Sequence, residues 1–218
     1  MNVALIQMVS SQKLEVNLRE AETLIAEAAS GPDYIFLPEN FAVLASENPR
    51  RIGNLEMTRE GPIRSFLRDI ARRHSCWLFG GTFPLACRPD GSLVSRGRVR
   101  AASLVLDPEG VEVRRYDKIH MFDVDVVDNQ GAYRESDSYE PGGDIVSLDC
   151  PLGRVGLSVC YDIRFPELYR SLFADEVDLV AVPSAFTEIT GEAHFELLIR
   201  ARAVENSCYM IAACQGGE

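Results

Sequence analysis

One cysteine in this chain stands where a thiol is well placed to act as a nucleophile. Cys160 ends the apolar run 156–159, and a helix-like pattern begins directly after it. A thiol between the carboxyl end of a strand and the N-terminus of a helix is partly exposed and is favoured as thiolate. An isolated cysteine more often packs as a small apolar side chain. The assignment therefore depends on which reactive groups lie near Cys160.

Two further reactive side chains, Glu39 and Lys118, also follow predicted strands. Glu39 comes after the apolar run 34–37, and Lys118 comes after the run 111–116. Ligands of open sheets bind at the carboxyl ends of the strands. We therefore expect Glu39, Lys118 and Cys160 to meet at the same edge of a sheet.

These three residue types together suit nucleophilic attack on an amide or nitrile carbon. A carboxylate in a dry pocket has a raised pKa and can take the proton of the thiol, which is a role for Glu39. The attack places negative charge on an oxygen or nitrogen of the substrate. Lys118 and the backbone N–H of Tyr161 can stabilise that charge.

Three other side chains have more than one interpretation. His120 or His194 could serve as the base for Cys160 instead, as the imidazole does in papain-like proteases. Arg164 lies one turn into the predicted helix, where it could bind a substrate carboxylate or pair with an acidic neighbour. The residues alone leave these alternatives open.

The remaining pattern alternates strands with helices and indicates an α/β fold. Strands are predicted at 3–7, 34–37, 77–79, 102–106, 111–116, 145–148, 155–159, 179–183 and 209–213. Helices are predicted at 14–28, 62–74, directly after Cys160, and at 192–206. Residues 121–144 are rich in Asp, Gly and Ser, which predicts a long surface loop. No linker or repeat divides residues 1–218, so a single domain is expected.

Composition and charge limit the partners of this protein. The chain has 22 Lys and Arg against 33 Asp and Glu, a net charge of −11, which argues against nucleic acid and anionic membranes. Residues 1–8 lack a basic segment and are too short for a signal peptide or a membrane helix. The six cysteines show neither metal-ligand spacing nor a disulfide pattern. We predict a cytoplasmic protein with reduced thiols.

Three segments of the chain resemble the catalytic motifs of the nitrilase superfamily of carbon–nitrogen hydrolases. They are Leu37-Pro38-Glu39-Asn40, Tyr116-Asp117-Lys118-Ile119-His120 and Val159-Cys160-Tyr161-Asp162-Ile163-Arg164-Phe165-Pro166-Glu167. They occur in the family's order of Glu, Lys and Cys. The resemblance continues through 183–186 and 190–206, so it covers nearly the whole chain.

The resemblance implies an α-β-β-α sandwich that hydrolyses non-peptide carbon–nitrogen bonds through a thioester on Cys160. In it Glu39 is the general base, Lys118 is the electrophilic stabiliser, and neither a metal nor an organic cofactor is needed. Related enzymes use a second glutamate to position the lysine and the substrate. Glu135 aligns best with it, and Glu140 is the nearby alternative. The expected substrate-binding residues are Tyr161, Arg164, Phe186 and His194.

Within the superfamily the chain resembles the branch that contains omega-amidase and deaminated glutathione amidase. The similar segments are 121–125, 160–167 and 193–196. This implies that the substrate is a small carboxylated amide, which is converted to the acid and ammonia. An N-carbamoyl amino acid hydrolase or a nitrilase would use the same three catalytic residues, so both stay open.

The resemblance also leads to expectations about assembly and length. Similar proteins form homodimers or larger homo-oligomers, and segments 165–173 and 197–204 would pack against a second subunit. Family members continue beyond the position of Glu218 with further strands and a tail. We therefore expect a C-terminally short nitrilase-like domain that lacks those strands. A catalytically inactive truncated scaffold is the alternative from another functional class.

Overall fold

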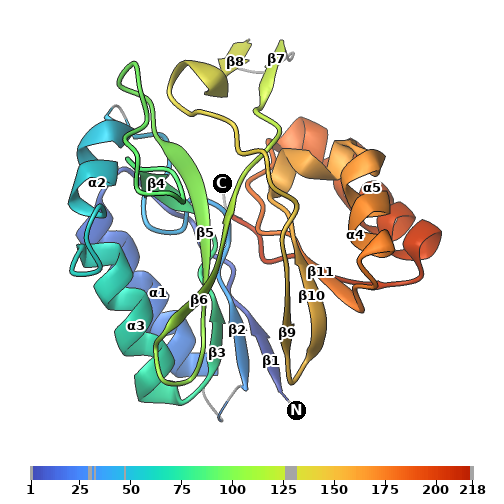
Figure 1. Cartoon of the computed structure of the whole chain (residues 1–218), viewed down its shortest axis with the longest axis horizontal. Coiled ribbons are helices and arrows are strands. Elements are labelled where there is room, and N and C mark those ends of the chain that lie inside the picture. The colour runs from blue at the N-terminus through green and yellow to red at the C-terminus, as the bar shows by residue number, and fades with distance from the viewer. Residues whose placement is uncertain (1, 29–30, 32, 47, 126–131, 217–218) are drawn as a thin grey trace.

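Two β-sheets packed face to face between two layers of helices form the core of the protein (Figure 1). The computed structural model describes residues 2–28, 31, 33–46, 48–125 and 132–216. The order of layers is helices, first sheet, second sheet, helices. This is the α-β-β-α sandwich that the motif resemblance implies.

The first sheet is built from the N-terminal half of the chain. Its strand order is β1 (Val3–Leu5), β2 (Tyr34–Phe36), β3 (Trp77–Phe79), β5 (Arg100–Leu106) and β4 (Phe83–Leu85), and β6 (Glu112–Asp117) also pairs with β5. The strands β1, β2 and β3 are parallel, while β5 is antiparallel to β3, β4 and β6. The helices of this half are α1 (Leu14–Ala28), α2 (Pro49–Leu55) and α3 (Pro62–His74). They lie on the outer side of the sheet, at the left of Figure 1.

The second sheet is built from the C-terminal half. Its strand order is β12 (Tyr209–Ile211), β11 (Leu179–Ala181), β10 (Gly153–Leu157) and β9 (Ser147–Cys150). Helices α4 (Pro166–Ala174) and α5 (Glu188–Asn206) cover its outer side, at the right of Figure 1. Between the two halves, β7 (Asp123–Asp125) and β8 (Ala132–Arg134) pair as a short antiparallel ribbon above the sheets.

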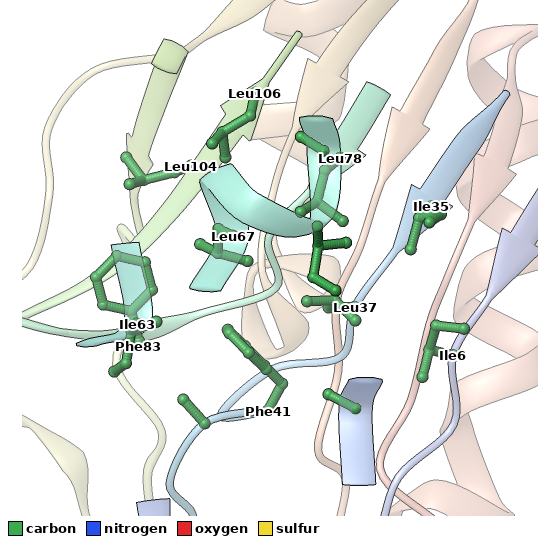
Figure 2. Close-up of a cluster of buried hydrophobic side chains, with 14 of the residues drawn as sticks. Ile6, Ile35, Leu37, Phe41, Ile63, Leu67, Leu78, Phe83, Leu104 and Leu106 are labelled. Atoms are coloured by element: carbon green, nitrogen blue, oxygen red, sulfur yellow. The ribbon is translucent and has the colours of Figure 1, made fainter. Parts of the chain in front are cut away.

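Three layers of buried apolar side chains hold the sandwich together. Helices α1 and α3 pack on the first sheet through residues such as Ile35, Leu67 and Leu78 (Figure 2). The sheets pack on each other through a second cluster, in which the rings of Phe36 and Phe79 stack at 4.2 Å. A third cluster joins α4 and α5 to the second sheet. Apolar residues on both faces of the central strands explain why those strands read as continuous apolar runs.

Most predicted elements are present, and several have the predicted bounds. Helices α1 and α3 cover residues 14–28 and 62–74, as the apolar spacing predicted. Pro62 opens α3 at a position where its missing N–H costs nothing, and Ser75 ends it in the left-handed conformation. Periodic apolar faces were therefore a sound guide to the helices that pack on a sheet.

Other predictions about the elements were wrong. Segment 121–144 is not one continuous loop, because it contains β7, β8 and a one-turn 3₁₀ segment at Glu135–Asp137; residues 126–131 lie outside the described part. The sequence patterns did not reveal α2 and β4. The helix after Cys160 starts only at Pro166, after a 3₁₀ turn at Cys160–Arg164. Strand β1 was expected to be buried, but it lies at the sheet edge and Leu5 is 49% exposed.

Within the described residues, no helix is both long enough and apolar enough to cross a membrane. All six cysteines are in this part of the chain, and all six are unpaired.

Candidate active site

The three predicted reactive residues meet at one end of the sandwich, but they come from both sheets. Glu39 and Lys118 follow β2 and β6 of the first sheet, whereas Cys160 follows β10 of the second. The expectation of a single sheet edge was therefore wrong. The two sheets pack face to face through the apolar core between them. The ends of β2, β6 and β10 therefore lie at the same end of the sandwich.

Lys118 is the centre of the site. Its Nζ donates to Glu39 Oε1 at 2.8 Å and to the Oε1 and Oε2 atoms of Glu135 at 3.0 and 2.9 Å. Lys118 and Glu39 are almost completely buried. A buried ammonium between two carboxylates is held in place by hydrogen bonds assisted by charge on both sides.

The structure separates Glu135, which the resemblance favoured as the second glutamate, from the alternative Glu140. Glu135 contacts Lys118, and its Oε2 also accepts from the backbone N–H of Phe122 at 2.6 Å. Glu140 instead accepts from Arg88 Nε at 2.7 Å and Arg100 Nη2 at 2.6 Å. Glu135 is therefore the glutamate positioned to act with Lys118.

Burial and mutual charge change the proton affinities of the central residues. Burial raises the pKa of Glu39, and the charge of Glu135 adds to this while Lys118 opposes it. Burial alone would lower the pKa of Lys118, but the charges of Glu39, Glu135 and Cys160 raise it well above its ordinary value. The expectation of a partly exposed thiol that is favoured as thiolate was wrong, because Cys160 is buried in the core between the sheets. Burial and Glu39 together raise the pKa of Cys160 well above that of a free thiol. The resting site thus holds a neutral thiol beside a carboxylate that can take its proton.

The backbone at Cys160 makes a sharp turn between strand and helix. Cys160 has a φ of +44°, a left-handed conformation that non-glycine residues adopt rarely. Its own N–H donates to the carbonyl of Pro183 at 2.9 Å. The next backbone N–H, that of Tyr161, makes no hydrogen bond within the described part of the chain. This N–H is therefore available to a substrate atom.

A buried aspartate ties the lysine segment to the cysteine turn. The Asp162 carboxylate accepts from the Tyr116 hydroxyl at 2.7 Å, from the His120 backbone N–H at 3.0 Å and from the Val159 backbone N–H at 2.8 Å. These donors flank Lys118 on one side and Cys160 on the other. Asp162 therefore holds the segment that carries Lys118, from the first sheet, in place against the turn that carries Cys160, from the second sheet.

Two glycines let the backbone approach closely beside the central residues. A Cβ at Gly142 would lie 2.1 Å from the carbonyl oxygen of Asp117, and the Gly142 N–H donates to the Lys118 carbonyl at 2.8 Å. A Cβ at Gly81 would lie 2.1 Å from the carbonyl oxygen of Pro38. Larger residues at these positions would displace the segments that carry Lys118 and Glu39.

A pocket of about 370 Å³ opens onto these residues. Glu39, Lys118, Glu135 and Cys160 all line it. The rest of its wall comes from the segment around the start of α2, the β7–β8 ribbon with its flanking residues, the 3₁₀ turn after Cys160, and the segment that leads into α5. These wall residues are Asn40, Leu44, Ala45, Ser46, Pro49, Phe122, Ala132, Tyr133, Arg134, Ser138, Tyr139, Tyr161, Ala185, Phe186, Thr187 and Thr190.

The predicted substrate-binding residues divide into two groups. Tyr161 and Phe186 line the pocket, but Arg164 and His194 do not. The guanidinium of Arg164 lies 5.7 Å from the centroid of each of the two aromatic rings. Its Nη1 is 3.3 Å from Nδ1 of His194. Arg164 and His194 therefore support the aromatic wall from outside the pocket.

The histidine alternatives for the base lie away from the thiol. His120 Nδ1 is 2.7 Å from Asp162 Oδ1, and the His120 ring stacks on Phe165 at 3.6 Å. Neither His120 nor His194 lines the pocket with Cys160. The geometry favours Glu39 as the base.

Several residues of the pocket wall were not singled out from the sequence. Phe122, Tyr133, Arg134 and Tyr139 come from segment 121–144, for which the sequence predicts a loop. Their only sequence signal is their position around Glu135. Within the described residues, no group of three or more His, Cys, Asp and Glu side chains is arranged to hold a metal ion.

Comparison with known proteins identifies the class of this enzyme. Residues 2–218 match the carbon-nitrogen hydrolase family. The chain belongs to that family and is a hydrolase of carbon–nitrogen bonds. This confirms the resemblance to the nitrilase superfamily that the three motifs indicated.

Individual members of the family show which proteins this chain is similar to. The chain is 43% identical to the deaminated glutathione amidase of Yersinia enterocolitica over 216 residues, which cover 99% of this chain and 73% of the relative. It is 39% identical to the deaminated glutathione amidase of Synechocystis sp. over 219 residues, 98% of this chain and 77% of the relative. The structure of Saccharomyces cerevisiae Nit3, a member of branch 10 of the nitrilase superfamily, aligns with a TM-score of 0.84 at 28% identity, covering 99% of this chain and 76% of Nit3.

The electrostatics of the site predict how the thiol reacts with a general alkylating reagent. Because Glu39 raises the pKa of Cys160, Glu39→Gln should lower that pKa and speed the alkylation of Cys160 by iodoacetamide at pH 8. The rate should rise about tenfold for each unit by which the pKa falls. Peptide mass spectrometry at successive times would follow each cysteine separately.

Cys76 is the internal control, because it is buried in the first helix–sheet cluster, away from Glu39. Its labelling should be equal in both proteins. Unchanged labelling of Cys160 in Glu39→Gln would show that the charge of Glu39 does not act on the thiol. Slower labelling would show that Glu39 speeds the alkylation by taking the thiol proton more than it slows it by raising the pKa.

Proposed function

We propose that this enzyme hydrolyses a small carboxylated amide through a thioester on Cys160. The observation that supports this most strongly is the buried Lys118 held between Glu39 and Glu135 in the pocket that also contains Cys160. This arrangement supplies a nucleophile, a base and a fixed positive charge where an amide can bind.

In the first half of the reaction, the Cys160 sulfur attacks the amide carbon while Glu39 takes the thiol proton. The negative charge that forms on the substrate oxygen is stabilised by Lys118 and by the free backbone N–H of Tyr161. Glu39 then passes its proton to the nitrogen, the carbon–nitrogen bond breaks, and a thioester is left. The released amine is ammonia when the substrate is a primary amide.

In the second half, water hydrolyses the thioester. Glu39, again a carboxylate, takes a proton from the water as the oxygen attacks the thioester carbon. Collapse of this intermediate breaks the carbon–sulfur bond, returns the proton to the Cys160 sulfur and releases the acid. Glu135 takes no proton in this scheme, because its two oxygens hold Lys118 in place.

The names of the relatives support deaminated glutathione, or a related monoamide of a dicarboxylic acid, as substrate. Deaminated glutathione would release the amine of a dipeptide rather than ammonia. Besides Lys118, the pocket wall carries a second cation, the half-exposed Arg134, which could bind the substrate carboxylate and also pairs with Asp125 at 2.7 Å. An N-carbamoyl amino acid hydrolase or a nitrilase would use the same site, and turnover of each substrate type would distinguish them.

We also propose a reducing compartment such as the cytoplasm as the place of action. The mechanism requires Cys160 as a free thiol, and all six cysteines are unpaired in the structure.

Cys160 gives the direct test of the mechanism. Cys160→Ala should lower kcat for α-ketoglutaramate or deaminated glutathione by at least about 10³-fold, because no thioester can form. Lys118→Ala should lower it by about 10²- to 10³-fold through loss of the charge that stabilises the intermediate. Ammonia and free amine are measured separately.

Circular dichroism and thermal melting of each variant serve as the control for folding. A matched substitution, Cys150→Ala, removes a half-buried thiol outside the pocket and should keep full activity. Turnover that survives in Cys160→Ala would contradict the proposal, and a folded chain without turnover on any amide, nitrile or carbamoyl substrate would favour the inactive scaffold.

The pH dependence of the reaction tests the role of Glu39. The base must be ionised, so kcat/KM should fall as the pH drops through the raised pKa of Glu39, at a higher pH than for an ordinary glutamate. The negative charge of Glu135 contributes to that raised pKa. Glu135→Gln should therefore move the acid limb to lower pH, in addition to lowering kcat. An acid limb that stays in place or moves upward would exclude Glu39 as the titrating base.

We further propose that the enzyme forms a homodimer through α4 and α5. These helices carry apolar residues with large exposed fractions, Phe173 at 44%, Leu197 at 65% and Val204 at 80%. Large apolar side chains exposed on two neighbouring helices are the kind of surface that a subunit contact covers. Sedimentation equilibrium should show a dimer for the unchanged chain and a monomer for Leu197→Glu with Val204→Glu. An unchanged mass in the double variant would exclude this surface as the interface.

A further inference from the structure

The pocket wall carries a hydroxyl group that the mechanism above does not use. Tyr139 lines the pocket together with Glu39, Lys118 and Glu135. Burial raises the pKa of its phenol, and among the neighbouring charges Glu135 has the largest effect. The phenol therefore lies on the Glu135 side of the pocket and remains protonated at neutral pH, where it can donate a hydrogen bond.

The phenol hydroxyl has no hydrogen-bond partner among the residues that the structure describes. Glu135 is not its acceptor, because the oxygens of that carboxylate receive Lys118 Nζ and the Phe122 N–H. The hydroxyl is not one of the buried polar atoms that lack a partner, so it is accessible from the pocket rather than sealed in the core. The natural partner of a hydroxyl that lines a pocket is a molecule bound in that pocket.

The backbone holds Tyr139 firmly in this position. Its N–H donates to the Glu135 carbonyl at 2.9 Å, and the neighbouring Glu140 N–H donates to the carbonyl of the buried Val99 at 2.7 Å. The Glu140 carboxylate is anchored to arginines on both sides of this contact, Arg88 and Arg100. The backbone that carries the ring is therefore held in place, which favours specific hydrogen bonding to a ligand.

The proposed mechanism indicates which part of a substrate reaches Tyr139. The scissile carbon lies at the Cys160 sulfur, and its oxygen faces Lys118. Glu39 must protonate the departing nitrogen, so that nitrogen lies on the Glu39 side. The acyl chain is left to extend along the Glu135 side of the pocket, toward Tyr139.

We propose that the Tyr139 hydroxyl donates a hydrogen bond to a second oxygen of the substrate, a carbonyl or carboxylate oxygen on the acyl chain. This inference rests on the proposed function and deepens it, because it assigns Tyr139 as a residue that determines specificity. A site with such a donor discriminates against an otherwise similar acyl chain that lacks the oxygen.

The test compares two primary amides of equal chain length, glutaramate, which carries a terminal carboxylate, and pentanamide, which carries none. In Tyr139→Phe, the ratio of kcat/KM for glutaramate to kcat/KM for pentanamide should fall about 3- to 30-fold, the loss expected for one hydrogen bond. Tyr209→Phe, a matched change at an exposed position on β12, should leave the ratio unchanged. Equal losses for both amides in Tyr139→Phe would indicate a merely structural role and overturn the proposal.

A binding experiment gives the same comparison without turnover. In the Cys160→Ala background, the Kd of glutaramate, relative to that of pentanamide, should rise about 3- to 30-fold when Tyr139 is replaced by Phe. An unchanged relative Kd, or no binding of glutaramate in the Cys160→Ala background, would overturn the assignment of Tyr139. If the unchanged chain does not turn over glutaramate but the change in relative Kd is seen, the result would count against the proposed mechanism and not against the assignment of Tyr139.

Discussion

The active site depends on one buried ion cluster, the ammonium of Lys118 between the carboxylates of Glu39 and Glu135. Each of these charges would be costly to bury alone. Together they satisfy one another at 2.8 to 3.0 Å. The same cluster sets the chemistry, because the two negative charges keep Lys118 protonated while burial and Glu135 make Glu39 a stronger base. In the proposed mechanism, the neutral thiol beside this base loses its proton as it attacks.

The rest of the fold can be understood as the support that this cluster needs. Face-to-face packing of the sheets brings Cys160 of the second sheet to Lys118 and Glu39 of the first. Asp162 joins both sides by accepting hydrogen bonds from residues next to Lys118 and next to Cys160. The close backbone contact between Gly142 and the carbonyl of Asp117 also holds the segment that carries Lys118 in place. These interactions explain how charged groups from distant parts of the chain are held in one geometry.

The segment after the lysine shows where sequence reasoning reached its limit. Its polar composition predicted a loop, yet it supplies Glu135, several wall residues and the Tyr139 hydroxyl. Glu135 and Glu140 are both acidic residues of this segment, and no local pattern says which one turns toward Lys118. The choice follows from arginines that come from elsewhere in the sequence and bind Glu140. Arg164 is a related case. Its predicted place in a helix after Cys160 was compatible with substrate binding, but in the structure the rings of Tyr161 and Phe186 line the pocket and Arg164 packs against them.

The sequence by itself determined the class of the enzyme, the layered α/β fold and the three central residue positions. It could do so because apolar periodicity and strand-end positions are local properties, and because the motifs around Glu39, Lys118 and Cys160 resemble those of the family to which the chain belongs. Only the tertiary structure decided that the site joins two sheets, that Glu135 rather than Glu140 meets Lys118, and that Tyr139 lines the pocket. The physical reason is that these outcomes depend on contacts between residues far apart in the chain. Burial and charge act through space, and no local pattern records them.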